Sequence, residues 1–112
     1  MLPRRIPKPA KRSSRWRSQA HCSFVRNHAC CACGSTAAIE VAHVRIGTGA
    51  GMGQKPSDFW TISLCHECHA RQHQMGEQSF ERFHSINMRT LAEEFAQASP
   101  RRMEIMEAKR NG

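Results

Sequence analysis

The sequence predicts a small α+β domain in which a β-hairpin is followed by several helices. Two short runs rich in β-branched residues are separated by a glycine-rich segment, and the apolar pattern changes to helical spacing after the second run. Two Cys-x-x-Cys pairs flank the predicted hairpin. With 112 residues, of which only seven are aromatic, the chain has a thin core, so a covalent or metal cross-link would help it to fold.

The first 18 residues predict a basic, flexible arm. They hold three of the five prolines and seven of the 17 Lys and Arg residues, a composition that favours disorder or loose docking. A short helix is expected over residues 19–28, with Phe24 and Val25 as its apolar anchors. Residues 30–35, CCACGS, then form a tight turn of small residues.

The β-hairpin is predicted from the next three segments. Residues 38–46, AIEVAHVRI, alternate loosely and predict a strand that contains His43. Residues 47–56 contain four glycines within seven positions and predict a flexible loop, which lacks the Gly-Lys-Ser/Thr end of a Walker phosphate-binding loop. Residues 59–64, FWTISL, predict the second strand.

Helices are expected over the rest of the chain. The first covers residues 66–75 and is ended by a glycine, and a shorter one covers residues 79–84. A third helix follows Asn87, whose side chain suits an N-cap position. A Ser-Pro dipeptide opens the last, polar helix over residues 99–112.

Four cysteines have the spacing of a zinc site. Cys30-x-x-Cys33 lies in a turn before the first strand, and Cys65-x-x-Cys68 lies at the junction of the second strand and a helix, which is a treble-clef layout. The sequence therefore predicts one structural Zn²⁺ in a closed Cys₄ site rather than buried or redox-active cysteines. Cys31 is an alternative to Cys30, although the x-x spacing favours Cys30 because it lets backbone N–H groups point at the sulfurs.

Histidines form the second group of candidate ligands. His69 and His73 are four residues apart on the expected helix, so their imidazoles share one face and suit chelation of a divalent ion. His66 is expected to point away from them. His43 lies in the strand that the hairpin lays across this helix, and a neutral imidazole near a metal-bound phosphate is a suitable general base. Solvated helix histidines and a structural strand histidine are the simpler interpretations.

The charge distribution indicates a polyanionic partner. Net charge is +8, and residues 1–57 hold ten Lys and Arg residues but a single acid. Clustered positive charge favours nucleic acid, because release of condensed counterions drives binding; a solubilising tail is the alternative. Neither a secretory signal nor a membrane-spanning run is visible, so a cytoplasmic protein without a membrane partner is expected.

Taken in order, the segments CCACGS, AHVR and LCHECHARQH resemble the HNH, or ββα-metal, endonuclease family. The segments FVR, GMGQKPSD and LCHECHARQHQMGEQSFE make the resemblance closest to a phage and prophage subgroup of Ref-like recombination-enhancement nucleases, over about residues 21–95. The resemblance implies a treble-clef ββα-metal nuclease domain with a structural zinc over residues 19–98. The basic arm at 1–18 precedes this domain, and the polar helix at 99–112 follows it.

The resemblance also implies an activity and its residues. The protein would hydrolyse DNA phosphodiester bonds in a bacterial host cytoplasm, during recombination or DNA processing, with His43 as general base. His69 and His73 would bind Mg²⁺ or another divalent cation. Many members carry Asp or His before the base, where this chain has Ala42, and the middle Asn of the family name has no counterpart here. Asp58, the only acid in that region, is the candidate for either vacancy.

Two binding partners are expected from the charge distribution and the resemblance. DNA, single- or double-stranded, would be held through its backbone, and a recombinase filament is implied for the Ref-like subgroup. The basic residues expected to contact DNA are Arg45, Lys55, Arg71, Arg12, Arg15 and Arg17. The alternative function is a non-catalytic zinc-binding treble-clef module that holds nucleic acid or a protein partner.

Overall fold

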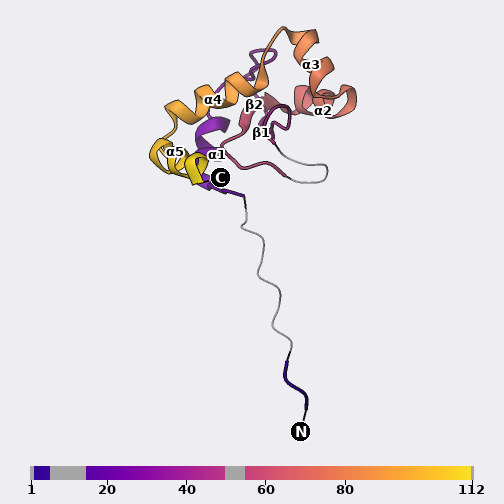
Figure 1. The fold of residues 1–112 in the computed structure, drawn as a ribbon. Helices are drawn as coiled ribbons and strands as arrows, with labels where there is room; N and C mark the ends of the chain where they lie inside the picture. The colour runs from indigo at the N-terminus through magenta and orange to yellow at the C-terminus, as the bar shows by residue number, and fades with distance from the viewer. Residues whose placement is uncertain (1, 6–14, 50–54, 112) are drawn as a thin grey trace.

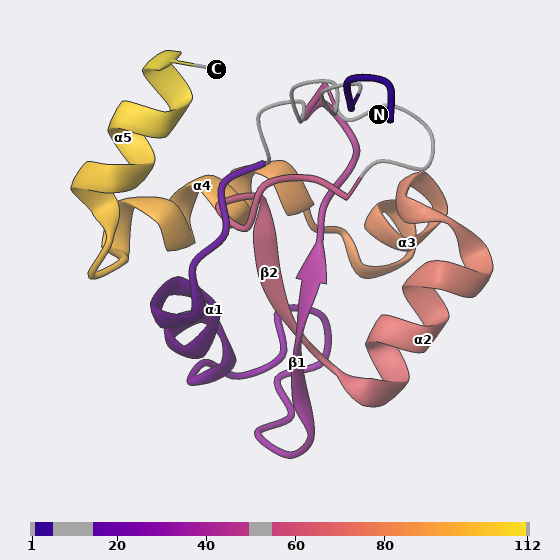
Figure 2. The same cartoon turned by 90° about the horizontal axis from the view of Figure 1, so that it is seen from below.

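The computed structural model describes residues 2–5, 15–49 and 55–111. Its elements are α1 (Gln19–Arg26), β1 (Ile39–His43), β2 (Thr61–Cys65), α2 (His66–Met75), α3 (Glu77–His84), α4 (Met88–Ala98) and α5 (Arg102–Asn111). Figures 1 and 2 show the two strands between α1 and α2, with α4 running across them and α5 beyond the end of α4. The predicted mixed α+β class is confirmed.

The two strands form an antiparallel sheet in which His43 lies opposite Thr61. All five residues of β2 are buried, because α1, α2 and α4 contact the sheet. The hydroxyls of Thr61 and Ser63 are satisfied despite this burial, since each donates to a backbone carbonyl at 2.7 Å. The main core is formed by Cys30, Ala42, Val44, Ile62, Leu64, Cys65, Cys68, Phe80, Met88 and Ala92.

Both strands are shorter than the sequence suggested. The first was expected over 38–46 and the second over 59–64, but β1 stops at His43 and β2 starts at Thr61. One ladder bond continues past His43, from the N–H of Val44 to the carbonyl of Trp60, but the N–H of Trp60 donates to the carbonyl of Ser57 instead of to Val44, and regular pairing ends there. Residues 50–54 of the predicted flexible loop lie outside the described residues.

The helices agree closely with their sequence signals. The helix α2 spans the predicted residues and ends at Gly76, whose φ of 84° favours glycine. Asn87 caps α4 by accepting the N–H of Thr90 at 2.9 Å. The helix α1 ends two residues before the predicted position, and α3 begins two residues earlier than expected because it starts directly after Gly76.

The folded part of the chain begins before the predicted boundary at residue 18. The N–H of Trp16 donates to Ser57 Oγ at 3.2 Å, and its carbonyl accepts the N–H of Asp58 at 2.9 Å. The Trp16 ring centroid lies 5.8 Å from that of Phe59. Residues 16–18, which we call the N-terminal strap, are therefore docked beside residues 56–58. Arg12 of the predicted arm lies outside the described residues.

The C-terminal helix α5 shares a small second core with the rest of the chain. Ile105 is 2% exposed and packs with Phe59 and Ala96, while Trp16 and Trp60 border the same cluster. The polar helix predicted over 99–112 is thus present, but its one buried apolar residue ties it to the domain. None of the helices in the described ranges is long and apolar enough to cross a membrane.

Candidate functional site

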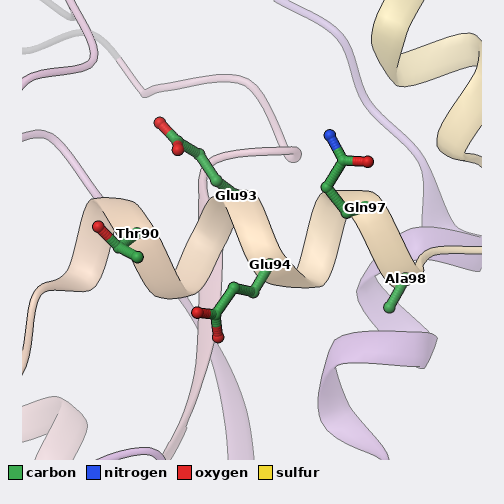
Figure 3. A pocket seen from close by; sticks show the side chains of 5 residues that line it. All are labelled: Thr90, Glu93, Glu94, Gln97 and Ala98. Atoms are coloured by element: carbon green, nitrogen blue, oxygen red, sulfur yellow. The ribbon is translucent and has the colours of Figure 1, made fainter.

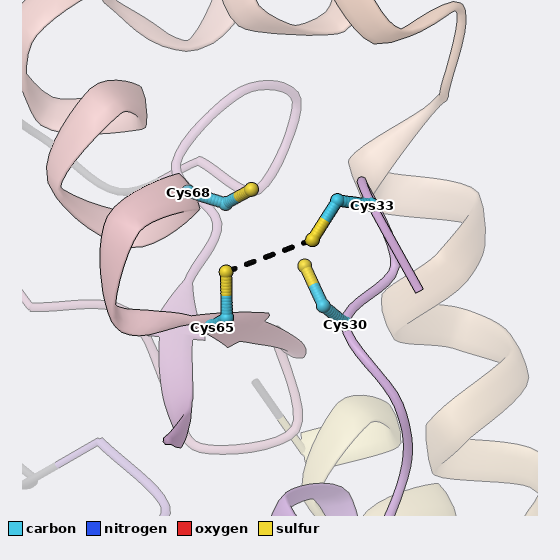
Figure 4. Close-up of side chains that lie close together, drawn as sticks. All are labelled: Cys30, Cys33, Cys65 and Cys68. Atoms are coloured by element: carbon cyan, nitrogen blue, oxygen red, sulfur yellow. Dashed lines mark hydrogen bonds between the residues drawn. The ribbon is translucent and has the colours of Figure 1, made fainter. Parts of the chain in front are cut away.

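Four cysteines converge where β2 meets α2 (Figure 4). The sulfurs of Cys30, Cys33, Cys65 and Cys68 all lie within 4.8 Å of one another, and those of Cys33 and Cys65 are 3.7 Å apart. Four ligands at a Zn–S distance of about 2.3 Å place the sulfurs of a tetrahedron roughly 3.8 Å apart, whereas a disulfide requires about 2.05 Å. The predicted cluster is therefore confirmed, and its geometry suits a structural metal ion such as zinc.

Cys30, rather than its neighbour Cys31, belongs to this cluster. The Cys31 sulfur lies 3.4 Å from Ser63 Oγ and outside the group of four. Burial acts to raise the pKa of Cys30, but three backbone N–H groups, including that of Cys65, outweigh it and lower this pKa to about 7. A lowered pKa favours the thiolate, which is the form that binds metal.

His69 and His73 lie side by side on α2, as their spacing predicted. Their Nε2 atoms are 3.3 Å apart, and their ring centroids are separated by 5.0 Å. Two nitrogens at about 2.1 Å from one ion can have this separation. The pair is therefore able to supply two ligands to a single divalent cation.

Glu40 joins these histidines and was not expected from the sequence. Its Oε1 lies 2.9 Å from Nδ1 of His69, and its Oε2 lies 2.9 Å from Nδ1 of His66. These two hydrogen bonds lower the pKa of Glu40, and the same carboxylate raises the pKa of His66. With Nδ1 of His69 held by a carboxylate, Nε2 is the nitrogen left for a metal. His66 shares this carboxylate, so it does not point away as expected.

One signal for Glu40 was present in the sequence. It is the only acid among residues 1–57, and it lies in the strand beside the start of α2. In the structure, the N–H of His66 donates to the carbonyl of Ala38 at 2.9 Å, and this hydrogen bond holds the start of α2 beside β1.

His43, the last residue of β1, is paired with Asp58. Its Nε2 lies 2.9 Å from Asp58 Oδ1, and Asp58 is only 6% exposed. Burial lowers the pKa of His43, and the Asp58 carboxylate offsets only part of that effect. Burial acts to raise the pKa of Asp58, but hydrogen bonds from His43 and from the N–H of Ser18 hold it below its usual value. The pair is thus a neutral imidazole on an ionised carboxylate.

The sequence suggested Asp58 as a metal ligand beside His69 and His73, and in the structure its carboxylate is hydrogen-bonded to other groups. Asp58 Oδ1 is shared by His43 and Arg17, and Oδ2 accepts the N–H of Ser18 at 2.9 Å. In the part of the chain that the structure describes, only the four cysteines form a group of three or more His, Cys, Asp or Glu side chains able to hold a metal. The Asp58 carboxylate is therefore hydrogen-bonded to His43 and to the N-terminal strap.

The structure thus has two histidine sites, one formed by His43 and Asp58 and the other by Glu40 with the histidines of α2. The two sites lie on opposite faces of β1. Side chains alternate along β1, so those of Glu40 and His43 point to opposite faces. The helix α2 contacts both strands and runs beside β1 in Figure 2. Among the described residues, no hydrogen bond or ion pair joins His43 to His69 or His73.

The basic residues predicted to contact DNA have different surroundings. Arg45 after β1, Arg71 on α2, Lys55 in the returning loop and Arg15 before the strap are all exposed. Arg17 differs, because its guanidinium group binds two loop carbonyls and a buried carboxylate. Its role in the structure is therefore to anchor the strap, which the arm composition did not predict.

A shallow pocket on α4 contains none of the predicted site residues. Glu93, one of its lining residues, is already paired with Arg89 at 3.2 Å. The lining side chains, shown in Figure 3, are Thr90, Glu93, Glu94, Gln97 and Ala98. The pocket is separate from the cysteine cluster and from both histidine sites.

Comparison with known proteins assigns the chain to a family. Residues 5–100 match the family described as "Protein of unknown function (DUF968)". No curated protein and no solved structure matches the chain. The matched range covers well over half of the sequence and includes both cysteine pairs and all the paired histidines. The protein therefore belongs to the DUF968 family.

Proposed function

We propose that the protein is a metal-dependent endonuclease of the HNH type that hydrolyses DNA phosphodiester bonds. The observation that carries this proposal is that the expected general base and one expected metal ligand are each hydrogen-bonded to a carboxylate. Asp58 binds His43, and Glu40 binds His69. Carboxylates of this kind fix the tautomer and orientation of catalytic and metal-binding imidazoles, whereas solvated helix histidines do not need them.

His43 would act as the general base. Its Nε2–H donates to Asp58. Nδ1, which has no hydrogen-bond partner among the described residues, would take a proton from the water that attacks phosphorus. Because burial lowers the pKa of His43, the ring is unprotonated near neutral pH and ready to accept that proton. The Asp58 carboxylate then stabilises the imidazolium that forms.

His69 and His73 would hold a divalent cation through their Nε2 atoms, with Glu40 orienting His69. A cation bound there supplies electrostatic stabilisation of the phosphate and of the leaving oxygen. Two imidazole donors suit a transition-metal ion better than Mg²⁺, which prefers oxygen ligands. The exposed side chains of Arg45 and Arg71 would contact phosphates nearby.

The second candidate is a zinc-binding module that holds nucleic acid or a protein without catalysis. The observation in its favour is the separation of the two histidine sites on opposite faces of β1. In this alternative the His43–Asp58 and His69–Glu40 pairs only stabilise the fold, and the cysteine cluster is the one metal site.

Cleavage of supercoiled plasmid and of circular single-stranded DNA distinguishes the two candidates. The zinc-loaded protein is incubated with Mg²⁺, Mn²⁺, Co²⁺ or Ni²⁺, with and without a recombinase filament. We expect metal-dependent cleavage that falls by about 10²- to 10⁴-fold in His43→Ala. His28→Ala, which alters an exposed histidine two residues after the end of α1, is the matched control. Equal cleavage by His43→Ala, or no cleavage with any ion, would reject the proposed enzyme.

A further inference from the structure

We propose that Arg17 is a positioning residue for His43 and acts through Asp58. The inference rests on the proposed role of His43 as general base. The arm composition had placed Arg17 among the side chains that contact DNA. Its contacts assign it instead to the hydrogen-bond network behind the base.

Asp58 is held through both of its carboxylate oxygens. Oδ1 receives Nη1 of Arg17 at 3.2 Å and Nε2 of His43 at 2.9 Å. Oδ2 receives the backbone N–H of Ser18 at 2.9 Å. Two of these three donors belong to the N-terminal strap, so the strap determines how the carboxylate is presented to His43.

The guanidinium group of Arg17 is itself fixed in place. It donates to the carbonyl of Lys55 at 3.2 Å and to the carbonyl of Pro56. The preceding residue, Trp16, is hydrogen-bonded to Ser57 and Asp58 and packs against an aromatic ring. Arg17 therefore links the strap, the returning loop and the carboxylate, and a free surface arginine would do none of this.

This arrangement also acts on the protonation of His43. Asp58 raises the pKa of the imidazole, whereas Arg17 and Lys55 lower it. On the side of α1, Cys22 and His21 are the titratable groups that face Asp58. Loss of the Arg17 charge would remove a lowering influence and leave the Asp58 charge less compensated. Both changes raise the pKa of His43.

Histidine titration by NMR tests the inference on the full, zinc-loaded chain. The variants are Arg17→Gln, Arg17→Lys and the control Arg26→Gln, which removes the same charge from an exposed position on α1. His43→Ala assigns the resonance. We expect the His43 titration midpoint to move to higher pH in Arg17→Gln, to move less in Arg17→Lys, and to stay unchanged in Arg26→Gln. Thermal unfolding checks that each variant is folded, and Arg17→Met replaces Arg17→Gln if the latter is not.

The pH dependence of DNA cleavage gives a second readout. The acid limb of the rate profile should move to higher pH together with the His43 midpoint, and kcat near neutral pH should fall about tenfold with a smaller change in KM. An unchanged His43 midpoint in a folded Arg17→Gln protein would overturn the inference. A shifted midpoint in a protein that never cleaves DNA would support the Arg17–Asp58–His43 linkage and reject the nuclease function instead.

Discussion

Two carboxylates are hydrogen-bonded to histidines that the sequence singled out. Glu40 lies 29 residues before His69, and Asp58 lies 15 residues after His43. The histidines could be selected from the sequence because helical spacing and strand position are local properties. Their pairing with these two carboxylates could not be predicted, because only the hairpin and the start of α2 bring the partners together. The contacts of Arg17 were not predicted for the same reason, since its partners lie 38 to 41 residues away.

Removal of Glu40 should weaken metal binding on α2. Without the carboxylate, the His69 ring is free to rotate and its Nδ1–H loses its acceptor, so we expect Glu40→Ala to lower the affinity for Ni²⁺ or Co²⁺ by about 10- to 100-fold. Isothermal titration of protein whose cysteine site is already loaded measures the change. Glu67→Ala is the control, because Glu67 is an exposed acid on the same helix. Equal metal affinities in the two variants would show that Glu40 does not support metal binding.

The buried His21 should make the fold sensitive to acid. The ring is fully buried, Nδ1 lies 2.8 Å from Ser99 Oγ, and Nε2 has no hydrogen-bond partner among the described residues. Burial lowers its pKa, so the unfolded chain takes up the proton at a higher pH than the folded chain does. The stability linked to neutral His21 is complete above a pH of about 6.5 and is lost as the pH falls from there through the folded pKa.

Urea unfolding at pH 7.5 and pH 5.5 measures this effect. The free energy of unfolding of the wild type should fall more between the two pH values than that of His21→Asn. His43 has a pKa shifted in the same direction but is present in both proteins, so it cancels in the comparison. Equal losses in the two proteins would show that His21 is not the group responsible.

At the scale of elements, local signals located the helices better than the strands. The bounds of α2 were predicted correctly because a glycine ends it, and α4 was found from its Asn87 cap. Strand ends depend instead on which backbone groups pair across the hairpin. Regular pairing of β1 with β2 stops where the N–H of Trp60 donates to the carbonyl of Ser57 rather than to that of Val44. No periodicity in residues 38–46 could reveal that change of acceptor.

The start of α4 offers a test at this scale. Asn87 accepts the N–H of Thr90, and Glu81 accepts the N–H of Met88 at 2.7 Å, so two of the unpaired donors of the first turn are satisfied by side chains. Asn87→Ala should therefore reduce the free energy of unfolding by about 1 kcal/mol, whereas Asn87→Ser, which keeps an acceptor, should cost much less. Chemical denaturation of both variants gives the values, and equal losses would contradict the capping role.

At the scale of the whole molecule, the cysteine cluster links segments that are far apart in the sequence. It joins the turn before β1 to the start of α2, and three of its four cysteines belong to the main core. The spacing of the cysteines predicted this cluster because its four members come as two local pairs. The same spacing left Cys30 and Cys31 as alternatives because both adjacent thiols fit the pattern. The relative placement of the histidine sites was beyond sequence reasoning, since it depends on which face of β1 each side chain takes.

Loss of one cysteine ligand should therefore unfold the domain, and loss of its neighbour should not. Metal binding in small zinc modules supplies about 10–16 kcal/mol, which is comparable with the roughly 5–15 kcal/mol that stabilises an entire domain. We expect Cys65→Ser to purify with little zinc and to show no cooperative thermal transition. Cys31→Ser should keep one zinc per chain and unfold close to the wild-type temperature, because the Cys31 sulfur contacts Ser63 rather than the cluster.

Metal content by mass spectrometry and unfolding by circular dichroism measure both variants, and a chelator added to the wild type should reproduce the behaviour of Cys65→Ser. A zinc-free Cys65→Ser protein that still unfolds cooperatively would show that the ion is not structural. Loss of zinc from Cys31→Ser would instead show that Cys31 is a ligand. The first result would concern the source of the stability of the fold. The second would concern only which of two adjacent cysteines binds the ion. The two variants therefore test different properties of the same metal site.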